Sequence, residues 1–467
     1  MFDKILRSLF GVRDLPKKVE PKEYKRTQIK PVEHHRALPQ SDYPNFDDLF
    51  PEPIEPFPPL LVQRIPRANG VEFLGGASWL GGAPMLGDVD WPQANGIPMH
   101  HLATIDCSEL RSISSLNQLP EKGQLAFFAA LNTAPYTGAV RYIAAPRHVP
   151  VPNKLPLLCD KDSFVRGVDH VPASTDNGLL PRWPVRIHKL PTNGDNAEIE
   201  EVIRRYCGEK SRYSLSINDV AEFMPCGENV WCWDGIQRLA AALLTVGPEQ
   251  ISRKIKILES AQLRKEKDVA ASKPESLERN KLMLANNSVD LNRLRTGYAE
   301  FREFAEDFAV WAGSHYRWSP LGPSDIARFE QVFALTEYHE YAEERTDFGI
   351  FADSGDRPVR DQKSLASLSL KAAVTAAPEV FELLPKEVQE LTDIKYRRPA
   401  RLHQMFGNVD DIQAELEPHA NKHVLLQLSW DDVMNMTFGD VGVVQYVISP
   451  EDLDAGQFEA AIMVTNG

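Results

Sequence analysis

Two regions of the chain show short apolar runs that end at glycine, proline or asparagine. The first region, residues 67–190, contains "MHHLATID", "GQLAFFAAL" and "VRYIAA". The second region begins after Pro399 and contains "HVLLQLSW" and "VGVVQYVIS". Runs of this length, rich in branched and aromatic residues and bounded by turn formers, are typical of β-strands. We therefore expect strands in the N-terminal and in the C-terminal part of the chain.

Between residues 197 and 392 the apolar positions recur at i, i+3 and i+4. The repeat is clearest in "DGIQRLAAALLTV", "PEQISRKIKILESAQLRKEK" and "VDLNRLRTGYAEFREFAEDFAVWA". This spacing places the apolar side chains on one face of a helix. We predict a mainly helical insertion over residues 197–392. Pro248 is predicted to lie in the first turn of one of its helices, where proline is tolerated.

Residues 1–66 are predicted to form an arm without a hydrophobic core of its own. A short amphipathic helix is expected over the first twelve residues. It could dock on an anionic membrane or on a partner, but we favour a helix that packs on the body of the protein or a frayed terminus. Its apolar face comprises Phe2, Ile5, Leu6, Leu9 and Phe10. Eleven prolines follow from Pro16 to Pro66, and this composition favours a largely extended chain.

The two strand regions share an ordered pattern. "LATIDCSEL" (102–110) aligns with "LLQLSWDDV" (425–433), and "KGQLAFFAA" (122–130) aligns with "VGVVQYVIS" (441–449). The first pair is a strand followed by an acidic turn, and the second pair is a glycine followed by a strand. We predict an α+β fold with a duplicated, strand-rich and mostly antiparallel core. Its two similar halves, residues 67–196 and 393–467, flank the helical insertion.

Several motifs resemble those of the YwqG-like family, a bacterial domain family of unknown function. In the first half they are "GGAPML", "WP", "LATID" and "LPEKGQLAFF". In the second half they are "HQMFGNVDDIQ", "LLQLSWDD" and "FGDVGVVQYVISPEDL". The first strand of that family often has glutamine where this chain has Thr104, whereas Gln427 keeps the glutamine in the second half. The resemblance implies an α+β fold with a duplicated strand unit, and it implies no known activity.

The composition narrows the classes of partner. The chain has 467 residues and a net charge of -14, yet residues 1–40 hold ten Lys and Arg against five Asp and Glu. The rest of the chain is therefore strongly acidic, which disfavours binding to nucleic acid, because its phosphates need a basic groove. No apolar run reaches the roughly 18 residues of a membrane span. The N-terminus also lacks the features of a signal peptide, so we expect a cytoplasmic protein with reduced thiols.

The segment "GGASWLGGAPMLGDVDWP" (75–92) allows three interpretations. A Walker loop needs Lys and then Ser or Thr after its second glycine, but Gly82 and Ala83 stand there. Asp88 and Asp90 would lie about 6.6 Å apart on an extended chain. Together with Asp440 of the second half, they could bind a divalent cation or act as acid and base. We favour the third interpretation, consecutive turns formed by glycine, proline and aspartate.

Adjacent histidines precede one predicted strand. We expect strand alternation to bury one of His100 and His101 and to expose the other, as a core or edge side chain rather than a ligand.

Our leading hypothesis is a non-catalytic binding or protein-interaction module that takes a protein partner or a small ligand and needs no metal or cofactor. The predicted surface is the cleft where loops of the two halves converge. Its residues are Trp79, Pro84, Asp88, Asp90, Trp91, Gln427 and Asp440. Two alternatives stay open. One is a metal-assisted hydrolase that uses Asp88, Asp90 or Asp440, and the other is a membrane-peripheral scaffold anchored by residues 1–12.

Overall fold

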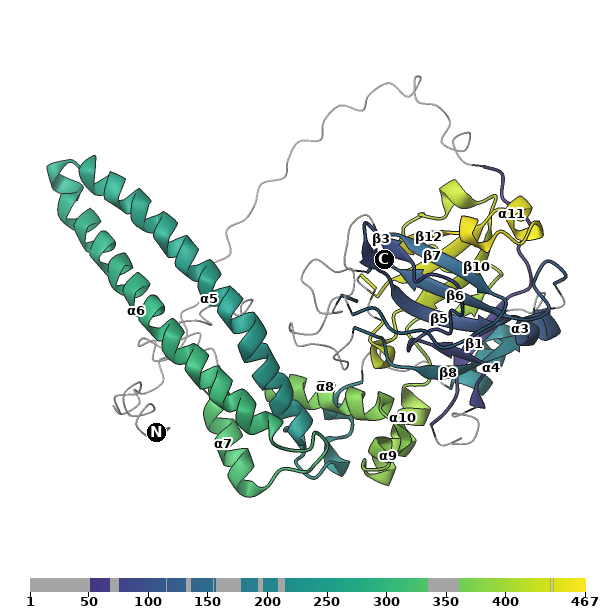
Figure 1. Cartoon of the computed structure of the whole chain (residues 1–467), viewed down its shortest axis with the longest axis horizontal. Helices are drawn as coiled ribbons and strands as arrows, with labels where there is room; N and C mark the ends of the chain where they lie inside the picture. The colour runs from purple at the N-terminus through teal and green to yellow at the C-terminus, as the bar shows by residue number, and fades with distance from the viewer. Residues whose placement is uncertain are drawn as a thin grey trace, which may run out of the picture.

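The computed structural model of the chain describes residues 51–67, 75–114, 116–131, 136–153, 155–156, 178–191, 196–208, 215–334, 361–436, 438–439 and 441–467. These residues form a body around one large β-sheet and a long helical hairpin that extends away from it (Figure 1). The predicted amphipathic segment and most of the predicted arm, residues 1–50, lie outside the described residues.

The sheet has ten strands, and its order is β12–β11–β10–β9–β1–β8–β2–β5–β6–β7. Every neighbouring pair is antiparallel. The strands are β1 (Leu60–Arg64), β2 (Ser78–Leu80), β5 (His100–Asp106), β6 (Gln124–Ala129), β7 (Gly138–Ile143), β8 (Trp183–Lys189), β9 (Gln404–Met405), β10 (His423–Ser429), β11 (Val443–Ile448) and β12 (Ile462–Asn466). A separate ribbon consists of β3 (Gln93–Ala94) and β4 (Ile97–Pro98). The predicted α+β fold with a mostly antiparallel sheet is confirmed.

Strand β1 lies at the centre of the sheet. It pairs with β8 over five residues, from Leu60 opposite Lys189 to Arg64 opposite Val185, and with β9 on its other side. All five of its residues are buried. Residues 60–64 fall at the end of the predicted extended arm, for which no strand is predicted. Its partners lie more than a hundred positions away in the sequence, so local pattern does not indicate its central place.

The sheet curls until its two edges nearly meet. Tyr446 of β11 donates its hydroxyl to the carbonyl oxygen of Phe128 in β6 at 2.8 Å, and its ring centroid lies 5.1 Å from that of Phe127. Gly138 on edge strand β7 permits this approach, because a Cβ there would lie 2.7 Å from the Cβ of Met463 on β12. Apolar side chains from both edges therefore fill one interior.

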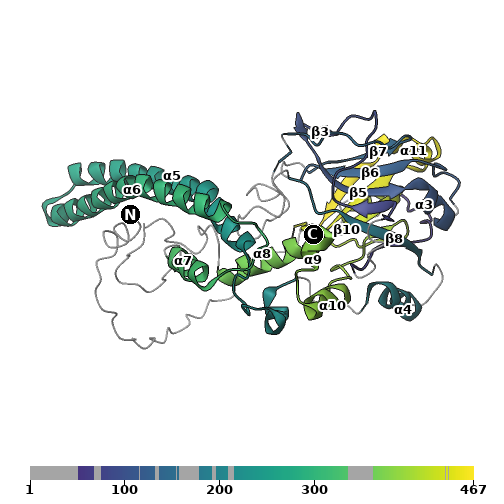
Figure 2. The ribbon, with the colours of Figure 1, turned by 60° about the horizontal axis from the view of Figure 1, so that its bottom comes forward.

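Short helices and turns surround the sheet (Figure 2). They are α3 (Cys107–Ser114), α4 (Asn196–Cys207), α8 (Gln362–Thr375), α9 (Pro378–Phe381), α10 (Lys386–Lys395) and α11 (Pro450–Asp454), with the 3₁₀ turns η3 (Ile217–Asp219), η4 (Ala221–Phe223), η5 (Glu417–His419), η6 (Asp432–Met434) and η7 (Phe458–Ala460). Helix α8 joins the body to the hairpin. Leu370 and Val374 pack in the core of the body, whereas Leu365 and Leu368 pack in the core at the base of the hairpin.

The hairpin consists of α5 (Trp233–Ala270) and α6 (Pro274–Gly313), and α7 (Pro323–Ala334) lies beside its base. At 1.5 Å per residue α5 is about 57 Å long. The helix continues through Pro248, so the prediction that a helix begins there is wrong. An interior proline costs a helix roughly 3 kcal/mol, so contacts made elsewhere along α5, including those with α6, must offset that cost.

A buried carboxylate fixes the base of the hairpin. Asp234, in the first turn of α5, accepts from Arg238 at 2.6 Å and also pairs with Arg317, which precedes α7. Burial alone would raise the pKa of Asp234, but the two arginines lower it below its ordinary value. The charge therefore joins α5 to the segment that leads into α7.

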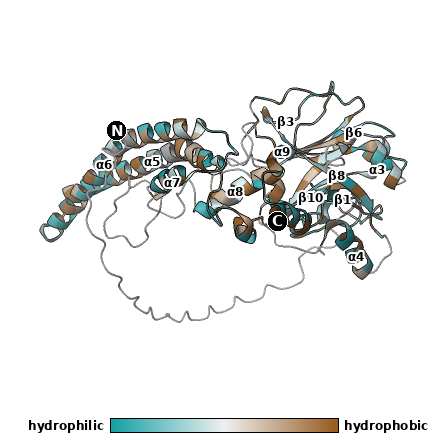
Figure 3. Cartoon of the chain, turned by 90° about the horizontal axis from the view of Figure 1, so that it is seen from below, coloured by the Kyte–Doolittle hydropathy of each residue, from teal (hydrophilic) through white to brown (hydrophobic). Residues whose placement is uncertain are grey.

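Hydrophobic and hydrophilic residues are interspersed along both hairpin helices out to the tip (Figure 3). No helix in the described ranges is long and apolar enough to cross a membrane.

The bond between the sheet edges gives a first testable prediction. Replacing Tyr446 by Phe should lower the free energy of unfolding by about 1–2 kcal/mol, because a buried hydrogen bond is lost while the ring is kept. Urea denaturation followed by tryptophan fluorescence measures the change. Tyr142→Phe is the matched control, since its hydroxyl also donates to a backbone carbonyl, that of Lys122, but in an exposed position. An equal loss in both variants would show that the edge contact contributes nothing particular.

Candidate functional site

The glycine-rich segment forms a tight entry to the sheet. Gly81 and Gly82 have φ values of 58° and 62°, and a Cβ on Gly81 would lie 2.0 Å from the carbonyl oxygen of Pro181. Their amide groups donate to the carbonyl oxygens of Leu102 and Leu180 at 2.8 and 2.9 Å. Because both N–H groups are already bonded, this turn cannot cradle a phosphate as a Walker loop does. The predicted turn interpretation agrees with this geometry.

His101 fixes the same turn from the sheet. Its Nδ1 lies 3.0 Å from the carbonyl oxygens of both Gly81 and Gly82, and its Nε2 lies 2.8 Å from the Thr104 hydroxyl. Carbonyl oxygens only accept, so Nδ1 carries the proton and Nε2 accepts from the hydroxyl. Burial lowers the pKa of His101 to about 4, which keeps the ring neutral. His100 is buried as well, so the expectation that one histidine is exposed is wrong, because other segments cover both faces of β5.

Trp79 and Pro84 of the predicted surface are both buried. Trp79 lies in β2 opposite Thr104 of β5, and the guanidinium of Arg182 lies 4.6 Å from its ring centroid. This cation–π contact occupies one face of the ring. The two residues therefore pack within the body.

Gln427 belongs to a row of three buried glutamines. Gln404, Gln427 and Gln445 lie opposite one another on β9, β10 and β11. Gln427 accepts from the backbone N–H of Asp410 at 3.0 Å and donates to the carbonyl oxygen of Leu402 at 3.1 Å. Gln445 donates to the Asp410 carbonyl at 2.6 Å and to Gln427 at 2.8 Å. The row fixes the loop that follows β9, and the hydrogen bonds of Gln427 are made within the chain.

The exposed aspartates face different surroundings. The Asp88 carboxylate lies 2.5 Å from the Arg147 guanidinium, a surface ion pair of small energetic value. Asp90 and Trp91 instead line an open hollow with Arg141 of β7 and Glu459 of η7. The structure therefore brings Asp90 and Trp91 together at the seam of the curled sheet.

The third carboxylate of the hydrolase hypothesis, Asp440, lies outside the described residues. Across the residues that the structure does describe, no group of three or more His, Cys, Asp or Glu side chains could hold a metal ion.

The acidic pair in "SWDD" forms buried ion pairs that the sequence analysis missed. The Asp431 carboxylate lies 2.9 Å from Arg64 Nε and 3.2 Å from His403 Nε2. His403 Nδ1 accepts from the backbone N–H of Ser429 at 3.1 Å, so its Nε2 carries the proton. Burial alone would raise the pKa of Asp431, but Arg64 and His403 lower it below its ordinary value. Because all these partners come from the body itself, the motif is structural.

A hollow of about 370 Å³ lies between residues 53–57 and the connection from β9 to β10. Phe57 stacks on His423 with ring centroids 4.0 Å apart and meets Phe406 edge-on at 5.7 Å. The amide of Ile54 donates to the carbonyl oxygen of Ala420 at 3.1 Å. The end of the arm thus forms one wall of this hollow.

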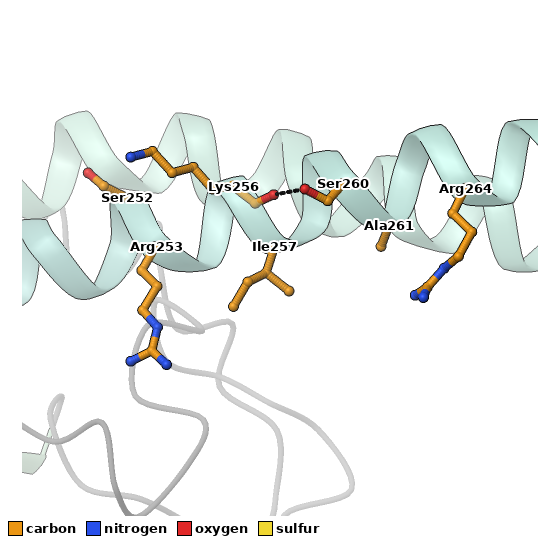
Figure 4. A pocket seen from close by; sticks show the side chains of 7 residues that line it. All are labelled: Ser252, Arg253, Lys256, Ile257, Ser260, Ala261 and Arg264. Atoms are coloured by element: carbon orange, nitrogen blue, oxygen red, sulfur yellow. Dashed lines mark hydrogen bonds between the residues drawn. The ribbon is translucent and has the colours of Figure 1, made fainter.

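The remaining candidate lies on the hairpin. We call it the basic face of α5, a hollow lined by Ser252, Arg253, Lys256, Ile257, Ser260, Ala261 and Arg264 (Figure 4). Arg253, Ile257 and Arg264 point to the same side of the helix. The only hydrogen bond drawn among the lining residues runs from the Ser260 hydroxyl to the Lys256 carbonyl at 2.9 Å. The sequence signal was a helical repeat of basic residues around an isoleucine, which the sequence analysis treated only as evidence for a helix.

The fold defines an α+β protein whose curled antiparallel sheet carries a long helical hairpin. A family model, the domain of unknown function DUF1963, matches residues 78–156 and 315–466. The chain belongs to this family, which is the YwqG-like family that its motifs resemble. The matched segments leave out residues 157–314, which contain the whole of α5 and α6. No curated protein matches the chain.

His101 gives a prediction on acid stability. Its folded pKa of about 4 lies below the unfolded value of 6.5, so the unfolded chain binds the proton first as the pH falls. The stabilisation is complete above pH 6.5 and is lost between pH 6.5 and 4. His101→Gln can still donate to the Gly81 carbonyl but does not titrate. As the pH falls from 6.5 to 4, the free energy of unfolding should therefore decrease less in the variant than in the wild type, by on the order of 3 kcal/mol.

Urea unfolding at several pH values between 7 and 4 measures the difference. His148→Gln is the control, because His148 is exposed and its removal should leave the pH dependence unchanged. A His101→Gln slope identical to that of the wild type would contradict a neutral, buried His101.

Proposed function

We propose that this protein is a non-catalytic protein-interaction module in which the sheet body holds the α5–α6 hairpin as a binding arm. The proposal rests on the exposure of large apolar side chains on both helices in the outer half of the hairpin. Ile257 is 57% exposed, Leu263 and Leu282 are each 62% exposed, and Val289 is 66% exposed. Several large apolar side chains left exposed on two neighbouring helices favour an interaction role for this part of the chain.

In the outer half of the hairpin, the two helices are held in register by a polar contact but bury few apolar side chains. Between residues 255 and 290, all of them described, Asn287 is the one buried residue. Asn287 donates to the Leu258 carbonyl at 3.1 Å and to Gln262 at 2.9 Å. A buried asparagine between helices fixes their register and lowers stability compared with an apolar residue. A partner that packs along the hairpin would supply the apolar burial that two helices lack.

The family match supports the same division of roles. The matched segments account for most of the sheet, whereas the hairpin lies in the stretch between them. In the body, His101, Gln427 and Asp431 make their hydrogen bonds and ion pairs within the chain. The hairpin is therefore the better place to look for what this chain binds.

The other hypotheses stay predictions. Residues 1–12 and Asp440, on which the membrane scaffold and part of the hydrolase depend, lie outside the described residues. A cytoplasmic location is part of this proposal, and it is supported by the four described cysteines, which are free thiols.

We also infer that the sheet consists of two similar halves. The strand order is symmetric about the β1–β8 pair, with β9, β10, β11 and β12 on one side and β2, β5, β6 and β7 on the other. The register supports the same relation, because Asp106 of β5 faces Gln124 of β6 as Ser429 of β10 faces Val443 of β11. Both pairs of strands shift register at the equivalent step, between His101 and Ala103 and between Val424 and Leu426.

A repeated hydrogen bond supports the two halves further. Ser78 Oγ accepts from the backbone N–H of Asp106 at 3.0 Å, and His403 Nδ1 accepts from that of Ser429 at 3.1 Å. Each side chain stands at or next to the start of a short strand, and each amide ends the long strand beside it. Ser78 in one half and His403 in the other thus make equivalent hydrogen bonds, although the residue types differ.

The interaction role is tested by a variant that removes apolar surface without touching a core. Leu263→Ser, Leu282→Ser and Val289→Ser combined should leave the melting temperature within about 2 °C, because exposed substitutions change stability little. The amount of each protein that the tagged wild type retains from its native cells should fall at least about tenfold when the tagged variant is used. Quantitative mass spectrometry of the retained proteins measures the loss.

Leu383→Ser with Ile394→Ser is the matched control, since these side chains of the body are 56% and 65% exposed. The control should retain the same proteins as the wild type. Equal retention by all three proteins, or equal loss in both variants, would contradict a binding role for the hairpin.

A further inference from the structure

We infer that the basic face of α5 binds an acidic amphipathic helix of a partner protein. The inference rests on the proposed function of the hairpin and names the chemistry of its partner. The observation behind it is a periodic placement of charge and apolar surface on one side of a single helix (Figure 4).

The spacing on α5 suits a helical occupant. Arg253, Ile257, Ala261 and Arg264 follow one another at intervals of four, four and three residues, and they form one stripe along the helix. Ile257 is 57% exposed, and Ala261 beside it is small enough to admit a side chain from a neighbouring helix. A second helix laid along this stripe could insert its apolar residues around Ile257 in the manner of a coiled coil.

The charges determine which helix fits. Arg253, Lys256 and Arg264 flank the apolar centre, and all three are exposed. In the part of the chain that the structure describes, none of the three forms an ion pair. Elsewhere on the hairpin cations do find carboxylates, such as Arg295 with Glu259 and Arg302 with Glu306. An occupant with glutamates or aspartates on either side of an apolar stripe would complement this face.

Other occupants fit the same face less well. A second copy would place arginine and lysine against arginine and lysine, which is repulsive. A bilayer requires a broad apolar face with aromatic or leucine side chains, and this face offers Ile257 and Ala261. Nucleic acid requires a basic groove, and the chain has a net charge of -14. The acidic helix is therefore the partner that the observations favour.

The test uses the full chain and a fluorescein-labelled, stapled helical peptide with a leucine stripe flanked by glutamates. Fluorescence anisotropy should show binding to the wild type. Arg253→Glu, Lys256→Glu and Arg264→Glu combined should raise the Kd at least about tenfold. Lys267→Glu, Lys281→Glu and Arg302→Glu combined are the matched control, because they change the net charge equally at other exposed positions of the hairpin and should leave the Kd within about twofold.

Two further probes separate a helix site from general attraction. Ile257→Ser should also weaken binding, whereas a scrambled peptide of the same composition should bind the wild type at least about tenfold more weakly. Circular dichroism should show unchanged helix content in all variants. Equal binding of the scrambled peptide, an equal loss in the matched control, or binding of phosphatidylglycerol vesicles in place of the peptide would each overturn the inference.

Capture from native cells distinguishes this inference from the proposed function. If the charge-reversed variant retains its partners while the Leu263, Leu282 and Val289 variant loses them, the partner chemistry is wrong and the interaction role stands. If both variants retain the same proteins as the wild type, the interaction role fails as well.

Discussion

The buried pairing of Asp431 with Arg64 and His403 holds three distant parts of the chain together. It joins the central strand β1 to the residue that precedes β9 and to the turn after β10. A charge at 2% exposure is costly to bury alone, so each member requires the others in place. Once β1 is fixed between β8 and β9, the two sets of strands become one continuous sheet. The curl of that sheet then brings Tyr446 against Phe128 and makes a single interior.

The buried polar groups of the body also bear on which surface is a candidate for binding. His101 and Gln427 direct their hydrogen bonds to loops and strands of their own half, and Asp431 pairs with His403 of its own half and with Arg64 of β1. The hairpin differs, because its base is anchored by Asp234 and by α8 while its outer half ends in exposed apolar side chains. The proposed interaction role rests on this contrast between a well-packed body and an incompletely packed arm.

The local sequence pattern predicted the strands and helices better than it predicted which segments they contact. The strands "LATID" and "GQLAFFA" and the helical spacing after residue 197 correspond to β5, β6 and the hairpin helices. The prediction at Pro248 is wrong, because the preference of proline for a first turn does not decide where a helix begins, and α5 begins at Trp233 and continues through Pro248. The histidine pair misled for a similar reason, since alternation predicts one exposed face and both faces of β5 are covered. Among the predicted surface residues, Trp79, Pro84 and Gln427 are buried, and a sequence cannot separate an aromatic or an amide that packs from one that binds.

The sequence by itself determined the family, the α+β class, the period of each element and the turn at Gly81 and Gly82, because these depend on residue type and short spacing. Only the tertiary structure decided that β1 is central, that Asp431 of "SWDD" is paired with Arg64, and that, among the described residues, the outer half of the hairpin keeps large apolar side chains exposed. Those features depend on which segments meet in space. Burial and the pairing of charges arise from contacts across the whole chain, and no window of neighbouring residues contains them.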